Sequence, residues 1–206
     1  MIKSHWNLRY IQNRVKNYLF EKNNPDLPWI NPDAIAVFNK LLVKSDVGIE
    51  CGSGSSTVWF SKRINKLYSI EDNLGWFNKV KKQIESARIN NIEYLFRDSN
   101  PENPILSDYC TFIDSFEDES LDFIVVDGKN RDIISLKAID KIKKGGFIYL
   151  DDSQRYLPIK THAPYAIYKK QDKISDNWKE FITKTKNWRK IWTTNGVSDG
   201  TFLLKK

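Results

Sequence analysis

Apolar residues along the chain follow two different periods, and the two alternate. Short, nearly continuous apolar runs are typical of strands buried on both faces, and they occupy residues 46–51, 66–71, 92–96, 121–128 and 147–152. Segments in which apolar residues recur every three to four positions are typical of helices, and they occupy residues 55–64, 76–87, 107–116 and 131–144. Because helices connect successive strands, the pattern predicts right-handed crossovers and a mostly parallel sheet with helices on both faces.

Both ends of the chain extend this core. Helical spacing predicts two helices ahead of the first strand, at 6–21 and 32–43, the second with Asn31 as N-cap and Pro32 at its first position. After the last parallel strand the pattern predicts a helix at 178–190 and then two strands around Asn-Gly and Asp-Gly turns.

The whole pattern predicts an α/β fold of the Rossmann-like, doubly wound kind. Its mostly parallel, seven-stranded sheet ends in an antiparallel hairpin, which the strands within 190–206 form. We expect residues 1–45 to form an N-terminal helical extension and residues 46–206 to form one domain. Gly145 and Gly146 are expected to stop the helix at 131–144.

Composition changes this picture little. The chain has 206 residues and two cysteines, Cys51 and Cys110, without the spacing of a zinc site or the density of a disulfide framework. The start lacks the apolar core of a signal peptide, and no apolar run approaches the roughly 20 residues of a membrane span. We therefore expect a cytoplasmic protein with no membrane partner, and the sequence does not indicate an oligomeric state.

Charge is spread unevenly along the chain, which has a formal net charge of +7. Residues 1–45 carry 7 Lys/Arg against 3 Asp/Glu, residues 46–159 carry 15 against 19, and residues 160–206 carry 11 against 4. The basic ends are expected to be solvated helix faces, with attraction of an anionic acceptor as the alternative. Nucleic acid is not expected, because no Arg/Lys block is interleaved with stacking aromatic residues. The added segments contain five tryptophans that are expected to pack these segments onto the sheet, with the lining of an acceptor pocket as the alternative: Trp6, Trp29, Trp178, Trp188 and Trp192.

Every predicted core strand ends on an acid. In open α/β sheets, ligands bind beyond the carboxyl ends of the strands, where the strand order reverses. The acids at or just after these ends are Glu50, Glu71, Asp98, Asp127, Asp151 and Asp152. Such a set favours a cationic ligand.

The first strand runs into a glycine-rich turn, "ECGSGSST". Gly52 and Gly54 allow close backbone approach, but Thr57 replaces the third glycine of the dinucleotide fingerprint. The Gly-Lys-Ser/Thr of a nucleotide triphosphate loop is absent from the turn. S-adenosylmethionine, a sulfonium with an ammonium group, suits the carboxylates. Glu71 lies about 20 residues downstream, where an acid accepts from ribose hydroxyls, and this spacing fits a nicotinamide cofactor equally well.

Four segments together resemble class I S-adenosylmethionine-dependent methyltransferases: "ECGSGSST", "YSIED" with Glu71, "VVDG" at 125–128 and "GGFIYLDD" at 145–152. The resemblance extends to a bacterial subgroup with "PWI-x-P" before the first strand, here residues 28–32, and "VDG-x-x-R" at the fourth strand, here residues 126–131. It covers residues 28–206. These motifs are more specific for the cofactor than for the acceptor.

The resemblance implies roles for individual residues. Glu50 would face the ammonium of the cofactor directly or through water, Glu71 would hold the ribose, and Asp72 and Asp98 would lie near the adenine. The plainer alternative for Glu50 is that it caps the positive end of the next helix. The implied cofactor-binding residues are Glu50, Gly52, Ser53, Gly54, Thr57, Glu71, Asp72 and Asp98.

Two routes to catalysis remain open. Asp127, Asp151 and Asp152 supply the hard oxygen ligands that Mg²⁺ prefers, as in metal-dependent O-methyltransferases. Alternatively, a general base, His162 or one of these carboxylates such as Asp127 or Asp151, takes the acceptor proton.

The acceptor is expected to be a small molecule or a saccharide with a hydroxyl or an amine. Lys129 and Arg131 follow Asp127 and could clamp an anionic group on it, with an internal ion pair of Arg131 as the alternative. A NAD-dependent oxidoreductase and a non-catalytic binding domain are the competing interpretations of the whole chain.

Overall fold

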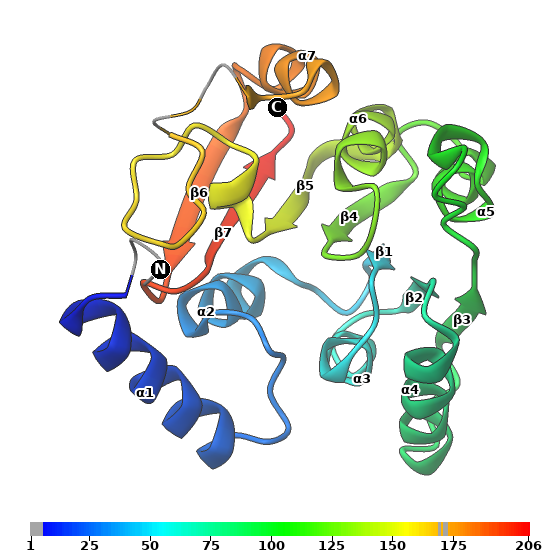
Figure 1. Cartoon of the computed structure of the whole chain (residues 1–206). Coiled ribbons are helices and arrows are strands. Elements are labelled where there is room, and N and C mark those ends of the chain that lie inside the picture. The colour runs from blue at the N-terminus through cyan, green and yellow to red at the C-terminus, as the bar shows by residue number, and fades with distance from the viewer. Residues whose placement is uncertain (1–5, 169, 171–172) are drawn as a thin grey trace.

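The sheet has seven strands in the order β3-β2-β1-β4-β5-β7-β6 (Figure 1). The computed structural model describes residues 6–168, 170 and 173–206. The strands are β1 (Val47–Cys51), β2 (Lys66–Glu71), β3 (Ile92–Phe96), β4 (Leu121–Val126), β5 (Ile142–Asp151), β6 (Arg189–Thr194) and β7 (Asp199–Leu204). β1 to β5 are parallel, whereas β7 runs antiparallel between β5 and β6. The predicted doubly wound sheet with a closing hairpin is therefore confirmed, and the strand order reverses between β1 and β4.

Helices cover both faces of the sheet (Figure 1). They are α1 (Leu8–Asn23), α2 (Pro32–Leu41), α3 (Ser55–Ser61), α4 (Leu74–Ser86), α5 (Asp108–Thr111), α6 (Arg131–Lys141) and α7 (Asp176–Lys184), with short 3-10 turns at Pro104–Leu106, Phe112–Ser115 and Ser153–Arg155. Asn31 caps α2 as predicted, because its side chain accepts from the amide of Ala34 at 2.8 Å and Pro32 needs no amide partner. No helix in the described part of the chain is long and apolar enough to cross a membrane.

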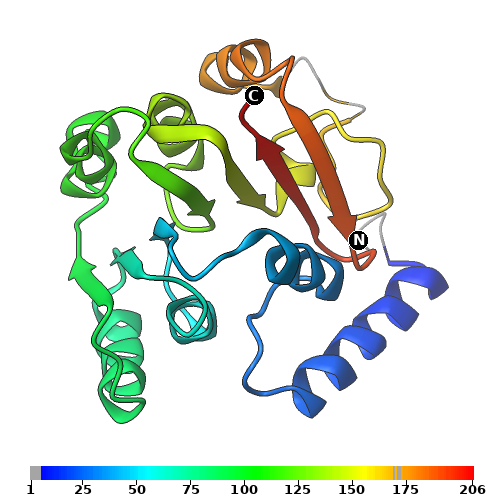
Figure 2. The same ribbon diagram turned by 180° about the vertical axis from the view of Figure 1, so that it is seen from behind.

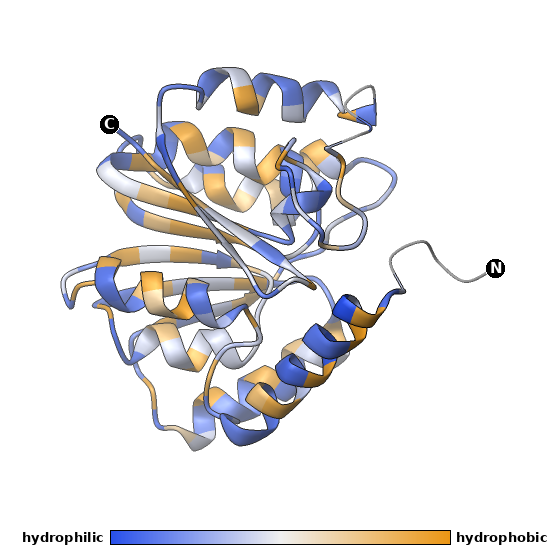
Figure 3. Cartoon of the chain, turned by 90° about the vertical axis from the view of Figure 1, so that its left-hand side faces the viewer, coloured by the Kyte–Doolittle hydropathy of each residue, from blue (hydrophilic) through white to orange (hydrophobic). Residues whose placement is uncertain are grey.

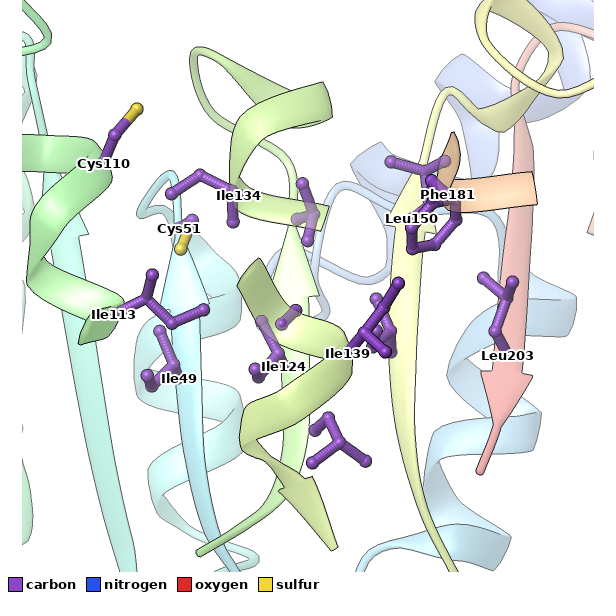
Figure 4. Packing of buried hydrophobic residues seen from close by; sticks show 14 of the residues in the cluster. Ile49, Cys51, Cys110, Ile113, Ile124, Ile134, Ile139, Leu150, Phe181 and Leu203 are labelled. Carbon is purple, nitrogen blue, oxygen red and sulfur yellow. The ribbon is translucent and has the colours of Figure 1, made fainter. Parts of the chain in front are cut away.

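The face covered by α6 and α7 is aliphatic (Figure 4). Alternate residues of the strands point to this face, since successive side chains of a strand face opposite ways. They include Ile49, Ile124, Leu150 and Leu203, which pack with Ile134 and Ile139 of α6 and Phe181 of α7. Cys51 and Cys110 are buried free thiols in the same cluster, as expected without a disulfide framework.

The opposite face is aromatic. Phe38 of α2 is fully buried, and its ring lies 4.7 to 5.0 Å from those of Phe60, Tyr149 and Phe202. The N-terminal segment thus contributes α2 to the core of the sheet. Gly48 belongs to this face, where a Cβ would lie 2.3 Å from the ring of Phe123, so the core aromatic residue requires glycine there.

Two predicted boundaries are wrong. The helix expected at 131–144 ends at Lys141, and β5 begins at Ile142, ahead of the two glycines. The register between β4 and β5 shifts here, and Gly145, with φ of +84°, takes the backbone through the irregularity. Gly146 lies close to the carbonyl of Asp122, so the glycines shape a bulge and do not stop a helix. The helix predicted at 107–116 is α5 followed by a 3-10 turn.

α1 differs from the other long helices because it has no buried residue. It lies at the edge of the molecule, beside the β6–β7 turn, in both opposite views (Figures 1 and 2). Trp6 and Trp29 are both exposed, so the expectation that these two tryptophans pack the added segments onto the sheet is wrong.

Candidate functional site

The turn after β1 packs against the turn after β4, where the strand order reverses. Gly52 has φ of +94°, and a Cβ there would lie 2.6 Å from the backbone nitrogen of Gly128. The amides of Asp127 and Gly128 both donate to the carbonyl of Cys51, at 2.9 and 2.6 Å. Gly54 lies in a less crowded part of the turn, since a Cβ there would contact only the Ser56 hydroxyl at 3.7 Å. The two glycines therefore differ, because only Gly52 is required for the close packing of the two turns.

Glu50 is fully buried beneath this turn. Its carboxylate accepts hydrogen bonds from the hydroxyls of Ser56 (2.5 Å), Thr57 (2.6 Å) and Ser69 (2.7 Å). Burial raises the pKa of Glu50 to about 7, against the effect of these three hydrogen bonds, and the charge of Glu71 raises it further.

This position decides what Glu50 can do. Ser56 and Thr57 belong to the first turn of α3, so the Glu50 carboxylate fixes the start of that helix to β1 and β2. A direct contact with a ligand ammonium is closed to a fully buried carboxylate, whereas the hydroxyls around it lie between Glu50 and the turn. The alternative role at the helix start therefore fits the geometry better.

Glu71, at the end of β2, is tied to the same turn. Its Oε2 accepts from the amide and hydroxyl of Ser53 at 3.1 and 2.8 Å, and its Oε1 accepts from the amides of Asp72 and Asn73 at 3.1 and 2.9 Å. These four hydrogen bonds occupy the lone pairs of the two carboxylate oxygens. Glu71 lies at the strand end where a ribose-binding acid was expected. The Ser53 hydroxyl donates to an oxygen of Glu71 that a ribose hydroxyl would otherwise reach.

Two aromatic residues that the sequence analysis did not select hold Ser53 in place. The Ser53 hydroxyl is 2.8 Å from the hydroxyl of Tyr94, and the Ser53 carbonyl accepts from the indole of Trp76 at 2.7 Å. Tyr94 stacks on Phe77 with ring centroids 4.5 Å apart. In the sequence, only their positions could have indicated these two residues. Tyr94 lies on β3, the strand next to β2, and Trp76 lies on α4, the helix that follows β2.

Asp72 and Asp98 lie at the same edge of the sheet. The Asp72 carboxylate accepts from the hydroxyl of Ser99 at 2.9 Å, which joins the ends of β2 and β3. Asp98 accepts from the amide of Asn100 at 3.1 Å, a loop role that any Asp could fill. The structure therefore brings Asp72 close to Glu71 and leaves Asp98 in the loop beside it.

The ends of β4 and β5 form a second acidic group around Arg131. The Arg131 guanidinium bonds to the Asp127 carboxylate at 2.8 Å, to the carbonyls of Asp151 and Gly128 at 2.7 and 3.0 Å, and to the Asp127 carbonyl. It also lies 5.7 Å from the ring centre of Tyr156. All three guanidinium nitrogens are engaged inside the protein, so Arg131 joins two strand ends and is not available to clamp an acceptor.

Asp127 and Asp151, at the ends of β4 and β5, are two carboxyl groups with unequal environments. Asp151 is buried and accepts from the hydroxyl of Tyr149 at 2.9 Å, whereas the Asp127 side chain is 42% exposed. Burial raises the pKa of Asp151 well above its usual range, and the charges of Asp127 and Asp152 add to the effect. Desolvation also raises the pKa of Asp127, to about 6, with Asp152 and Glu50 adding, while Arg131 and the hydrogen bond with Asp151 lower it.

Burial thus favours the protonated form of Asp151 more strongly than that of Asp127. The Asp151 carboxyl group accepts from the Tyr149 hydroxyl. Asp127 remains ionised, because neutral pH lies above its pKa, and it is the more accessible carboxylate of the pair.

The predicted Mg²⁺ site at Asp127, Asp151 and Asp152 does not fit the structure. Arg131 already pairs with Asp127, and burial favours the neutral form of Asp151. Asp152, with φ of +50°, accepts from the Ser198 hydroxyl at 2.9 Å and pairs with Arg155 at 3.1 Å. Across residues 6–168, 170 and 173–206, no group of three or more His, Cys, Asp or Glu side chains is arranged to hold a metal ion. The arrangement of the described residues therefore does not support the metal prediction.

His162 and Lys129 are the remaining predicted site residues. His162 is exposed on the loop after β5, and no hydrogen bond joins it to another described residue. Lys129 is exposed directly after the turn at Gly128. The structure thus does not bring His162 to the carboxyl pair, and it leaves Lys129 as the accessible cation beside Asp127.

Comparison with known proteins supports the fold independently. No protein-family model matches the chain, and no curated protein sequence matches it. Among solved structures, the fold is similar to a putative methyltransferase from Streptococcus mutans in complex with SAH, at 14% identity over 85% of this chain and 98% of that chain, with a TM-score of 0.56. It is similar to precorrin 8W decarboxylase from Methanobacterium thermoautotrophicum at 16% identity, over 89% and 95%, with a TM-score of 0.56. It is also similar to a SAM dependent methyltransferase from Aquifex aeolicus at 13% identity, over 92% and 96%, with a TM-score of 0.50.

At these identities the likeness shows the fold. The chain has the Rossmann-like fold of class I S-adenosylmethionine-dependent methyltransferases, with the strand order and the closing hairpin described above.

Proposed function

We propose that the chain is an S-adenosylmethionine-dependent methyltransferase that acts on a hydroxyl or amine of a small molecule or saccharide. The observation that carries the proposal is the placement of Glu71 and Asp127 on either side of the reversal point, next to the glycine turn. The "PWI-x-P" and "VDG-x-x-R" segments support the bacterial subgroup named above. The fold and this acidic edge together favour a cationic donor.

The residues around the turn suit this cofactor better than a dinucleotide. The side chains that hold the turn are carboxylates, hydroxyls and an indole: Glu50, Ser56, Thr57, Glu71, Tyr94 and Trp76. A pyrophosphate needs amide donors and usually a cation, and a carboxylate this close repels it. Glu71 would hold the ribose hydroxyls once the Ser53 hydroxyl rotates away, which a single-bond rotation allows. Gly54 leaves space for the amino-acid end.

When bound, S-adenosylmethionine supplies a methyl group that its sulfonium already activates. The protein then has to align an acceptor and remove its proton. Alignment alone can supply roughly 7–11 kcal/mol. Asp127 is placed to take the proton, because it is ionised above pH about 6 and accessible at the end of β4. Asp151 and Arg131 act as positioning residues that set the orientation and pKa of Asp127.

Lys129 is the residue we propose for contact with an anionic group on the acceptor. Its exposure next to Asp127 supports this role, whereas Arg131 is engaged within the protein.

The proposal is tested by supplying the protein with isotope-labelled S-adenosylmethionine and pools of hydroxyl- and amine-bearing metabolites and sugars. We expect labelled product and S-adenosylhomocysteine to form only when an acceptor is present. Cofactor binding without transfer to any acceptor would favour a non-catalytic binding domain. Activity unchanged by EDTA is expected, because the acids at β4 and β5 do not fit a metal ion.

A further inference from the structure

α1 exposes its more apolar face and turns a more polar face toward the protein, whereas a core helix does the reverse. Tyr10, Asn13, Asn17 and Phe20 recur every three to four residues and are half-buried toward the body of the protein. Phe20 packs on the aromatic core cluster, and Asn13 contacts the β6–β7 turn, where a Cβ on Gly196 would lie 2.0 Å from the Asn13 side-chain nitrogen. Asparagine side chains therefore occupy much of the face that touches the protein.

The apolar face of α1 points the other way. Large apolar side chains recur at the same spacing on this face, and each is 46 to 72% exposed: Leu8, Ile11, Val15, Tyr18 and Leu19. At about 100° per residue they lie opposite the half-buried face. Figure 3 shows these orange segments along α1 at the outer edge of the molecule. We call this surface the outer face of α1.

An exposed face of this kind has a large free energy available for binding. Covering a fully exposed Leu, Ile or Val side chain is worth roughly 1.5–3 kcal/mol. The outer face has five large apolar side chains on a helix about 24 Å long. Scattered exposed apolar residues need no explanation, but a continuous stripe opposite the docked face indicates a partner.

The charge beside the outer face is basic. α1 contains Arg9, Arg14, Lys16 and Lys22 against one acid, Glu21. On a helical projection, Arg14 borders the apolar stripe on one side, Lys16 with Arg9 beyond it lies on the other side, and Lys22 falls in line with the stripe. All are exposed, and no ion pair joins them to a carboxylate within the described residues. The partner that complements this surface is both apolar and anionic.

A second copy of the chain complements the outer face poorly. A two-fold contact places the same patch of both subunits together. The Arg9 and Lys16 border of one copy would then meet basic side chains of the other, and like charges repel. The repulsion offsets part of the gain from covering the apolar stripe.

We propose that α1 is an interfacial helix that docks the protein on an anionic phospholipid surface. A basic helix with one apolar face lies in the plane of a bilayer, with its Lys and Arg side chains reaching the headgroups. Tyr18, exposed within the stripe, is an aromatic residue of the kind favoured at the headgroup level. The proposed binding is peripheral, consistent with the absence of a membrane-spanning helix from the described residues, and it departs from our expectation that no membrane is a partner.

Cosedimentation of the full chain with vesicles tests the proposal. We expect binding to vesicles of equal parts phosphatidylglycerol and phosphatidylcholine, and at least tenfold weaker binding to phosphatidylcholine alone, because each basic residue contributes about 1 kcal/mol at an anionic surface. Raised salt should weaken the binding.

Matched variants locate the surface. The double substitution Ile11→Asn and Val15→Asn removes the centre of the outer face, and it should lower vesicle binding at least about tenfold. The control, Ile105→Asn with Leu106→Asn, removes two exposed apolar side chains elsewhere and should leave vesicle binding unchanged. Arg14→Gln with Lys16→Gln should lower binding to the anionic vesicles alone. Because these side chains are exposed, thermal unfolding should confirm that all variants fold.

Two results would overturn the proposal. One is no sedimentation with anionic vesicles at low salt. The other is a stable dimer in analytical ultracentrifugation that Ile11→Asn with Val15→Asn abolishes, since a second copy would then cover the outer face. Neither result bears on cofactor binding, which involves no residue of α1.

Discussion

The two acidic groups at the carboxyl edge of the sheet use the same residue types in opposite ways. At β1 and β2, Glu50 and Glu71 each accept several hydrogen bonds from neutral donors, which hold the glycine turn in one shape. At β4 and β5, Arg131 pairs with Asp127, and burial favours the neutral form of Asp151. We propose that the first group orients a ligand and that the second exchanges a proton.

The largest expected effect lies in the second group. Asp127→Asn should reduce methyl transfer by about 10²- to 10⁴-fold, since the variant has no base to take the acceptor proton. Binding of S-adenosylhomocysteine should change little, because the glycine turn and Glu71 are untouched. Turnover is measured with an acceptor found in the screen above, and binding is measured by calorimetry. Full activity of Asp127→Asn would assign the base elsewhere.

The pH dependence of turnover also tests Asp127 as the base. The pKa of Asp127 is raised to about 6, and only the ionised form accepts a proton. Turnover should therefore be constant above about pH 7 and fall tenfold per pH unit below about pH 6. A profile that is flat from pH 5 to 8 contradicts a base of this pKa.

In the first group, Glu71→Ala should weaken binding of S-adenosylhomocysteine by about 10- to 100-fold. The reason is the loss of the one hydrogen bond that opens when the Ser53 hydroxyl rotates away, and a hydrogen bond to a charged group is worth about 1.5–3 kcal/mol. Glu93→Ala on the neighbouring strand is the control, since Glu93 forms only an ion pair with Lys66 at 3.6 Å. Calorimetry measures both, with unfolding curves to show that each variant folds. Equal affinities of the two variants would remove the ribose role from Glu71.

Glu50 should affect how the free energy of unfolding depends on pH. Its pKa is raised to about 7 in the folded protein, so the folded protein retains a proton that the unfolded chain releases near pH 4.5. The stability that Glu50 contributes is therefore fully present below about pH 4.5 and is lost as pH rises to about 7. The loss is on the order of 3 kcal/mol. Urea unfolding of wild type and Glu50→Gln across this range should show the difference between their free energies changing by that amount, and parallel curves would contradict it.

The smallest expected effect is Arg131→Lys. Lysine keeps the charge at Asp127 but cannot bond to both strand ends at once, so the free energy of unfolding should fall by about 1–2 kcal/mol. Lys137→Arg, at the exposed ion pair with Asp114, is the control and should stay within about 0.5 kcal/mol. Equal stability of both variants in urea unfolding would show that the guanidinium does not join the strands.

The sequence alone predicts the sheet and the positions of its acids well. The apolar runs and the glycine turn place Glu50, Glu71, Asp127 and Asp151 at the correct strand ends, because strand ends follow from local patterns. The partners of these acids depend on which strands become neighbours, and no local pattern contains that information.

Arg131 and Tyr149 illustrate the limit. Arg131 lies one helical turn after Asp127, and its bond to the Asp151 carbonyl exists only because β4 and β5 are adjacent. The Tyr149 hydroxyl likewise bonds to Asp151, two residues further along β5. Because Arg131 pairs with Asp127 and the Tyr149 hydroxyl bonds to Asp151, fewer carboxylate lone pairs are free for the predicted metal site. The three hydroxyls around buried Glu50 are a similar case, since the burial of a carboxylate becomes evident only in the packed structure.

Calorimetric titration of the protein with S-adenosylhomocysteine and, separately, with NAD⁺ tests the central claim most directly. The acidic edge beside the glycine turn predicts saturable one-to-one binding of S-adenosylhomocysteine and no measurable binding of NAD⁺. Binding of NAD⁺ in the absence of binding to S-adenosylhomocysteine would contradict the proposed donor and favour an oxidoreductase on the same fold.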